Sequence, residues 1–212
     1  MIENLSKLNI VRIGSHITFS SLKEIGIKIV DSFRDIIEDF TLFHYNTPIL
    51  ESIDAHFLTL MLHDEYEGHT LGITDADLKT SDEDEFYNSI LGGKNPENDV
   101  AVVSTKKLSP AEITSENDYD LYVARTLKVS LHEVGHNLGL TDHASYQTAE
   151  DGLLCPMSRG EFNKFGYVGY VRAIVDSRGL NFCDECTDFL KKMYGYRGNW
   201  AKFLKDGIQF AP

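Results

Sequence analysis

The chain lacks the features that mark an exported or membrane-embedded protein. No apolar run approaches the roughly 20 residues that a bilayer-spanning helix needs. Residues 1–7 show no basic region followed by an apolar stretch and a small-residue cleavage site. Cysteine is scarce as well, since there are three residues, all in the last third, and an odd number is a poor disulfide framework. We therefore expect a cytoplasmic protein.

Positive charge is also in short supply. The chain has 20 lysines and arginines against 33 aspartates and glutamates, which gives a formal net charge of −13. Nucleic acids and anionic membranes would repel such a protein, so we expect neither as a partner. The acidity can simply serve solubility, or it can form an acidic cleft rim that favours basic peptides. Composition alone does not locate such a rim.

The 212 residues, 42% of them hydrophobic, are enough for one domain with a proper core, or for one domain with two lobes around a cleft. There is no internal repeat or low-complexity tract. Strands alternate with helices in the first hundred residues, which predicts an α/β fold with a mixed sheet. The predicted strands are Leu8–Ile13, Thr41–Tyr45, His69–Thr74, Phe86–Leu91 and Val100–Ser104. The predicted helices are Ser20–Phe40, Ala55–His63, Tyr119–Leu138 and one that begins near Cys183.

The most informative stretch reads HExxHxxGxxD and begins at His132. His132 and His136 are four residues apart, so they project from the same face of a helix and can share one metal ion. Glu133 is placed to activate a water bound to that metal. Gly139 allows the helix to stop and the chain to turn, so that a third ligand, Asp142, comes back under the metal. This is the metzincin variant of the zinc peptidase motif, with aspartate where a third histidine is usual.

The cysteines suggest a second metal site. Cys183 and Cys186 form a CxxC pair, a spacing that is typical of zinc sites. A redox-active CxxC is less favoured because no thioredoxin-like strand precedes it. Buried thiols without a common role are the remaining interpretation.

Together these residues resemble the archaemetzincin family, whose pattern is HExxHxxGxxH followed at once by Cys, then Cys-x-Met, then CxxC. The matching residues are His132, Glu133, His136, Gly139, Cys155-Pro156-Met157, Cys183 and Cys186. Segments 71–78 and 101–104 look like the family's sheet segments, as do Arg125 and Lys128 before the motif. The resemblance covers about residues 8–192. It implies a metzincin-like fold with a mixed twisted sheet and helices in an N-terminal lobe, a zinc-bearing active-site helix, and a smaller irregular or helical C-terminal lobe.

The chain departs from the family pattern at two adjacent positions, where Asp142-His143 stands in place of His-Cys. Carried over by position, Asp142 becomes the third ligand of the catalytic zinc. The resemblance then implies a structural zinc bound by four residues, His143, Cys155, Cys183 and Cys186. Carboxylate and imidazole are both accepted zinc ligands. The rival is a slip of one residue, which puts His143 on the catalytic zinc and leaves the cysteines one ligand short.

The expected site lies between the two lobes, 1–139 and 140–212, which together form one catalytic domain. The resemblance makes Met157 the Met-turn residue, an apolar base beneath the zinc ligands. Phe86–Leu91 is the candidate upper rim, where an edge strand pairs with extended substrate, although a plain edge strand fits equally well. A tyrosine after the motif could stabilise the oxyanion, but the sequence does not pick it out. Five histidines have no ligand-like spacing and are interpreted as structural or surface residues: His16, His44, His56, His63 and His69.

The function that we expect is hydrolysis of peptide bonds by a monomeric zinc metallopeptidase with two zinc ions per chain, one catalytic and one structural. Glu133 would be its general base, and a peptide or protein its substrate. The alternative is a zinc-stabilised module that binds peptides or proteins on a peptidase scaffold with little hydrolytic activity. Glu133 favours the enzyme, because a binding scaffold has no need of it.

Overall fold

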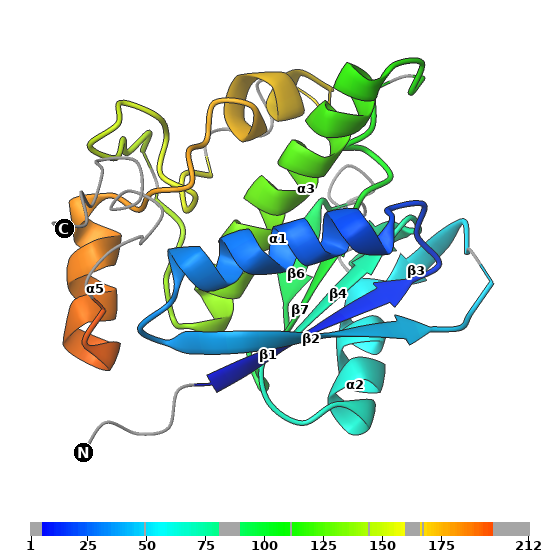
Figure 1. The fold of residues 1–212 in the computed structure, drawn as a ribbon, viewed down its shortest axis with the longest axis horizontal. Coiled ribbons are helices and arrows are strands. Elements are labelled where there is room, and N and C mark those ends of the chain that lie inside the picture. Colours follow the sequence, from blue (N-terminus) through cyan, green and yellow to red (C-terminus); the bar gives the residue numbers. More distant parts are fainter. Residues whose placement is uncertain are drawn as a thin grey trace, which may run out of the picture.

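The computed structural model of the chain describes residues 6–48, 50–80, 90–110, 112–143, 145–159, 166 and 168–196. Its main elements, in chain order, are β1 Ser6–Ile13, α1 Phe19–Ser32, β2 Ile37–Tyr45, β3 Ser52–Asp54, α2 Ala55–Glu65, β4 Thr70–Thr74, β5 Asp77–Lys79, β6 Gly92–Lys94, β7 Val100–Ser104, α3 Glu116–Asn137, the π-helix η1 Val171–Val175 and α5 Asp184–Tyr194. Figure 1 shows the strands side by side, with α5 set apart at one end of the molecule.

The main sheet has five strands in the order β2-β1-β4-β7-β6. Its first four strands are parallel, and β6 runs antiparallel to β7 at one edge. A second, two-stranded parallel sheet joins β3 and β5. The mixed α/β fold predicted from the sequence is therefore confirmed. The central strands β4 and β7 are buried along their whole length, as is usual where helices cover both faces of a parallel sheet.

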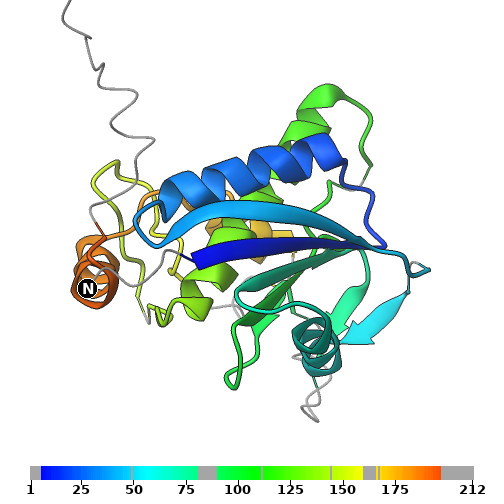
Figure 2. The ribbon, with the colours of Figure 1, turned by 60° about the horizontal axis from the view of Figure 1, so that its bottom comes forward.

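Successive side chains of the strands point to opposite faces of the sheet and pack into two separate hydrophobic cores. The larger core joins one face of the sheet to α1, α3 and the C-terminal segment; its sheet residues include Leu8, Ile10, Leu71, Ile73, Ala101 and Val103. The smaller core joins the other face to α2, through Val11, Ile13, Val100, Val102, Ala55, Leu58 and Leu62. Figure 2 shows α1 and α2 on opposite sides of the sheet. The sheet is thus held rigidly between helices, and α3 lies on its larger core.

One predicted helix needs correction, and one predicted strand falls mostly on residues that the structure does not describe. The helix predicted to reach Phe40 ends at Ser32, and the chain then turns tightly into β2. In this turn the N–H groups of Ile36 and Ile37 both donate to the Phe33 carbonyl, at 2.7 Å. The strand predicted at Phe86–Leu91 lies mostly outside the described residues, because 81–89 are not described.

The edge strand that the structure does describe is β6. It contains Gly92 and Gly93, which come directly after the predicted strand Phe86–Leu91. This strand packs against α3.

The long helix α3 begins with a capping box. Ser115 Oγ accepts a hydrogen bond from the Asp118 N–H, and the Asp118 carboxylate accepts one from the Ser115 N–H. This arrangement satisfies donors at the helix start and places acidic groups at the positive end of the helix dipole. None of the described helices is both long and apolar enough to cross a membrane.

The far side of α3 is fastened to the C-terminal segment by a partly buried ion pair. Arg125 binds both carboxylate oxygens of Asp176 at 2.7 Å and also donates to the Leu108 carbonyl. Lys128 Nζ donates to the main-chain carbonyl of Asp176 at 2.7 Å. Arg125 and Lys128, which resemble the family's residues before the motif, therefore tie the helix to the segment that follows η1.

Candidate active site

Three side chains converge at the C-terminal end of α3. The Nε2 atoms of His132 and His136 lie 3.2 Å apart, and Asp142 Oδ1 lies 3.3 and 3.4 Å from them. Both histidines come from the last turns of α3, whereas Asp142 follows the helix. Gly139 makes this return with a φ of 86°, a left-handed conformation that strains any residue with a Cβ. The Leu140 N–H then donates back to the Gly135 carbonyl.

The other polar atoms of these three side chains also have hydrogen-bond or ionic partners. Nδ1 of His132 donates to the Pro156 carbonyl and Nδ1 of His136 to the Leu140 carbonyl, both at 2.9 Å. Each ring therefore carries its proton on Nδ1 and presents the lone pair of Nε2 to the common point. The second carboxylate oxygen of Asp142 lies 3.6 Å from Arg159 Nη1. The three ligand atoms are thus all held facing one point.

These distances suit zinc. With zinc–nitrogen and zinc–oxygen bonds of about 2.0–2.2 Å and tetrahedral angles, ligand atoms should lie about 3.3–3.6 Å apart. The measured separations of 3.2–3.4 Å agree with that spacing. Two imidazoles and one carboxylate leave a fourth position for a reactant, which is the composition of catalytic zinc sites.

A second cluster consists of His143, Cys155, Cys183 and Cys186, all buried. His143 Nε2 lies 3.1 Å from Cys186 Sγ and 3.2 Å from Cys183 Sγ, and the sulfurs of Cys155 and Cys186 are 3.9 Å apart. Tetrahedral zinc with sulfur ligands at about 2.3 Å requires sulfurs about 3.8 Å apart. The hydrogen bond from Cys186 lowers the pKa of Cys155 to about 5, despite the opposing effect of burial. The donor set therefore suits a closed structural zinc site.

The two clusters divide the adjacent residues Asp142 and His143 between them. Asp142 joins His132 and His136, while His143 joins the cysteines. His143 forms an isolated β-bridge with Ser158, and successive side chains of an extended chain point in opposite directions. The His143 N–H donates to the Met157 carbonyl at 3.0 Å, which holds this part of the chain in place. The structure therefore brings Asp142 to the two histidines of α3 and His143 to the three cysteines.

Glu133 lies beside the first cluster, and only 5% of it is exposed. Burial raises the pKa of its carboxyl group to about 7. Gly92 of the edge strand β6 packs directly on this carboxylate, since a Cβ atom at Gly92 would lie 2.5 Å from Glu133 Oε1. The edge strand thus lies directly against the Glu133 carboxylate. No pattern in the sequence connects Gly92 with Glu133, because the contact arises only from the packing of β6 against α3.

Met157 lies beneath the histidines and is fully buried. A Cβ atom at Gly135 would lie 2.7 Å from Met157 Sδ, so the sulfur packs closely on the helix between the two histidines. The loop that carries Met157 also supplies the Pro156 carbonyl to His132. This loop therefore forms an apolar floor and orients a ligand.

A cleft of about 590 Å³ contains the first cluster and Glu133. Its described wall also includes Ile90, Gly92, Gly93 and Lys94 on the strand side and Arg159, Tyr170 and Arg178 from the C-terminal segment. Sequence reasoning missed Arg159 and Arg178 and did not select Tyr170 among the tyrosines. These side chains reach the cleft through the irregular part of the chain, where no periodicity indicates their direction. The five histidines interpreted as structural or surface residues belong to neither described cluster.

Comparisons with known proteins agree with these observations. Residues 47–148 match the family model described as Peptidase family M54. A curated archaemetzincin from Aeropyrum pernix is 31% identical over 151 residues, which cover 70% of this chain and 67% of that protein.

Solved structures show the same fold. The archaemetzincin of Methanopyrus kandleri superimposes with a TM-score of 0.63 at 22% identity, covering 89% of this chain and 94% of that one. The archaemetzincin of Archaeoglobus fulgidus gives a TM-score of 0.57 at 20% identity, covering 86% and 99%. A zinc-dependent peptidase from Methanocorpusculum labreanum gives 0.55 at 14% identity, covering 84% and 97%. On the motif, the fold and the sequence match to a curated relative, the chain belongs to the archaemetzincin family, peptidase family M54.

Proposed function

We propose that this protein is a zinc-dependent peptidase in which His132, His136 and Asp142 hold the catalytic metal. One observation carries the proposal: three ligand atoms 3.2–3.4 Å apart lie in one cleft beside a buried glutamate. Zinc bound there would polarise the substrate carbonyl and make a nearby water more acidic. Family membership supports the same metal and the same class of reaction.

Glu133 is the proposed general base. It accepts a proton from the attacking water, whose oxygen bonds to the peptide carbonyl carbon. When the carbon–nitrogen bond breaks, Glu133 delivers this proton to the leaving amine. Its carboxylate is well suited to the task because it lies beside the two histidines, directly against Gly92. General acid–base help of this kind contributes about 10²- to 10⁴-fold to the rate.

The edge strand β6 is the proposed binding strand for extended substrate. It pairs with β7 on one side and stands at the edge of the described sheet on the other. An extended peptide can add to such an edge by main-chain hydrogen bonds. Because Gly92 contacts Glu133, a peptide along this edge passes close to the base.

The second cluster is proposed to hold a structural zinc, which makes two zinc ions per chain. His143, Cys155, Cys183 and Cys186 have the composition of closed zinc sites, which contribute directly to folding free energy. In the same proposal Met157 is the Met-turn residue of a metzincin, and 1–139 and 140–212 are the two lobes of one catalytic domain. Three thiols held for a metal suit a reducing compartment such as the cytoplasm.

A zinc-stabilised binding module is the less favoured alternative. Carboxylate ligation by Asp142 lowers the charge on zinc, which would weaken hydrolysis. However, a binding module gains nothing from a buried carboxylate beside the metal ligands, and burying Glu133 costs free energy. The position of Glu133 therefore favours the enzyme.

The test compares the zinc-loaded protein with its Glu133→Gln variant on a mixed peptide library, followed by mass spectrometry. We expect cleavage by the wild type, loss of about 10²-fold or more in the variant, and the same zinc content in both. Cleavage by the variant within threefold of the wild-type rate would refute the role of Glu133. A fully zinc-loaded wild type that cleaves no peptide would refute the enzyme and favour the binding module.

A further inference from the structure

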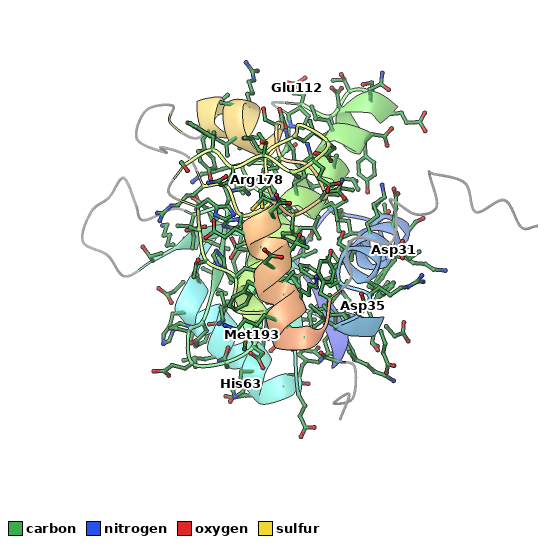
Figure 3. The ribbon with its side chains drawn as sticks, turned by 90° about the vertical axis from the view of Figure 1, so that its left-hand side faces the viewer. Asp31, Asp35, His63, Glu112, Arg178 and Met193 are labelled. Atoms are coloured by element: carbon green, nitrogen blue, oxygen red, sulfur yellow. The ribbon has the colours of Figure 1, made fainter. Side chains whose placement is uncertain are left out.

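Arg178 is a buried cation in the wall of the catalytic cleft, and the chemistry described above does not use it. Only 3% of the residue is exposed, although its side chain lines the cleft together with Val129 and Tyr170. Figure 3 shows it in the irregular segment above α5. Nε and Nη2 donate to the Ser158 carbonyl at 3.1 and 2.8 Å, and Nη2 also lies 3.3 Å from the Tyr170 hydroxyl oxygen.

Arg178 forms no ion pair in the described part of the chain, because no carboxylate oxygen there lies within 4.0 Å of its nitrogen atoms. Glu133 and Asp142 are near enough for their charges to act on it, but Asp142 is turned to the histidines and Glu133 to Gly92. The hydrogen bonds of Arg178 to Ser158 and Tyr170 come from Nε and Nη2, not from Nη1. A buried charge without an ionic partner is unfavourable for folding, so an anionic ligand would stabilise this guanidinium group.

The charge of the cleft points to the nature of that ligand. In a chain with a net charge of −13, the described wall of the cleft carries three cations, Lys94, Arg159 and Arg178. Its carboxylates are Glu133 and Asp142, which both belong to the proposed catalytic machinery. The acidic rim that would favour basic peptides is therefore not found along this wall, and the local charge favours an anion.

We propose that Arg178 binds a carboxylate group of the peptide substrate, so that the cleft selects peptides with an acidic group close to the scissile bond. This inference rests on the proposed peptidase function. The guanidinium group carries five N–H donors in one plane, and those of Nη1 are not used by Ser158 or Tyr170 and can bind a carboxylate. The carboxylate can belong to an aspartate or glutamate side chain or to the C-terminus of the substrate, and both have the same recognition chemistry.

The first test uses matched peptides with the wild-type protein. The two peptides of a pair differ at one position flanking a cleaved bond, where one has Asp and the other Asn, or one has Glu and the other Gln. Every peptide is made in two forms, with a free C-terminus and with an amidated C-terminus. We expect kcat/KM to be about 10- to 100-fold higher with the carboxylate, the gain typical of a hydrogen bond to a charged group. A rate that depends on the Asp or Glu residue indicates that a side-chain carboxylate is bound, and a rate that falls on amidation indicates that the C-terminal carboxylate is bound. Equal rates within twofold for every pair would overturn the inference while leaving the peptidase function intact.

Binding provides a readout that does not depend on hydrolysis. The same pairs are titrated calorimetrically into the zinc-loaded Glu133→Gln variant, and the carboxylate members should bind about tenfold or more tightly. If the wild type cleaves no peptide, this titration still shows whether the cleft prefers peptides that carry the carboxylate. Equal binding of all members would refute carboxylate recognition.

Variants then separate recognition from packing. Arg178→Gln should abolish the preference for the carboxylate peptides, and Arg178→Lys should restore part of it. Arg172→Gln removes an exposed arginine of η1 and is the matched control, with an unchanged preference expected. Melting temperature and zinc content show whether each variant is folded. If Arg178→Gln slows the amide and carboxylate peptides equally, Arg178 only supports Ser158, and the inference is wrong. If this variant does not fold, the wild-type pairs decide.

Discussion

Asp142 and His143 are neighbours in the chain, yet their side chains take part in different clusters. Asp142 Oδ1 lies within 3.4 Å of both histidines of α3, and His143 Nε2 lies within 3.2 Å of two cysteine sulfurs. A change in either residue should therefore disturb one cluster and spare the other. This separation makes the two alanine variants informative as a pair.

Asp142→Ala should leave a folded protein that keeps its cysteine-bound zinc but holds the other zinc weakly and has little activity. Loss of a residue that only hydrogen-bonds to a zinc ligand typically lowers the zinc affinity by about 10- to 100-fold. Loss of the ligand Asp142 itself should lower the affinity for the catalytic zinc by more than that. His143→Ala should instead lower the melting temperature by roughly 10 °C or more, because structural zinc contributes to folding free energy. Zinc per chain and calorimetric melting with and without chelator measure both effects. If both variants lose the same zinc, the division between the clusters is wrong.

Substitution of Gly92 should change the position of the Glu133 side chain. In Gly92→Ala the new methyl group would meet the Glu133 carboxylate at 2.5 Å, so Glu133 must move. A displacement of about 1 Å in a catalytic group can cost about 100-fold in rate. We expect such a loss of kcat/KM with unchanged zinc content, measured on any peptide that the wild type cleaves.

Gly93→Ala is the matched control for this substitution. Its methyl group would meet only the end of the Ile90 side chain, at 3.2 Å, which can give way. Activity within a few-fold of the wild type is expected. If both variants are equally impaired, the effect comes from the strand backbone and not from Glu133.

At the scale of elements, α3 connects the sheet to the site. One of its faces packs on β7 and β6 in the larger core, and its last turns carry the two histidines and Glu133. Arg125 and Lys128 hold the C-terminal segment against the same helix through Asp176. The helix therefore fixes the distance between the strand side and the C-terminal side of the cleft.

Arg125→Met should destabilise the protein by about 2–4 kcal/mol, because it leaves the partly buried Asp176 carboxylate without its main partner. Lys28→Met breaks the exposed pair of Lys28 with Glu24 and should cost about 0.5 kcal/mol or less. Chemical denaturation of both variants provides the comparison. Equal losses of stability would mean that the Arg125 pair does not fasten the two parts.

The elements also show where sequence patterns stop being informative. The apolar spacing of Phe33, Ile36 and Ile37 suited a continuing helix, but in the structure these residues fill the same core from a tight turn and the start of β2. Periodicity reports which side chains are buried, and a turn against the core satisfies it as well as a helix does. Three-residue strands such as β3, β5 and β6 are too short to show a period at all.

At the scale of the whole molecule, the site combines one local segment with several distant ones. His132, Glu133, His136 and Asp142 lie within eleven residues, so their helical spacing makes them visible in the sequence. Arg178 and Gly92 come to the same cleft from opposite sides, through tertiary packing that no local pattern encodes. The metal ligands were therefore within reach of sequence reasoning, whereas the walls that would select a substrate were not.

The division of the ligands between two zinc ions is the central claim, and X-ray absorption at the zinc edge tests it most directly when combined with a count of zinc per chain. The wild type should bind two zinc ions. Asp142→Ala stripped of its weaker zinc should show three sulfur neighbours near about 2.3 Å and one nitrogen near about 2.0–2.1 Å. His143→Ala should keep the nitrogen and oxygen neighbours of the other zinc. A single zinc per wild-type chain, or a spectrum of His143→Ala in which the zinc bound by the α3 histidines has lost a nitrogen neighbour, would contradict the account.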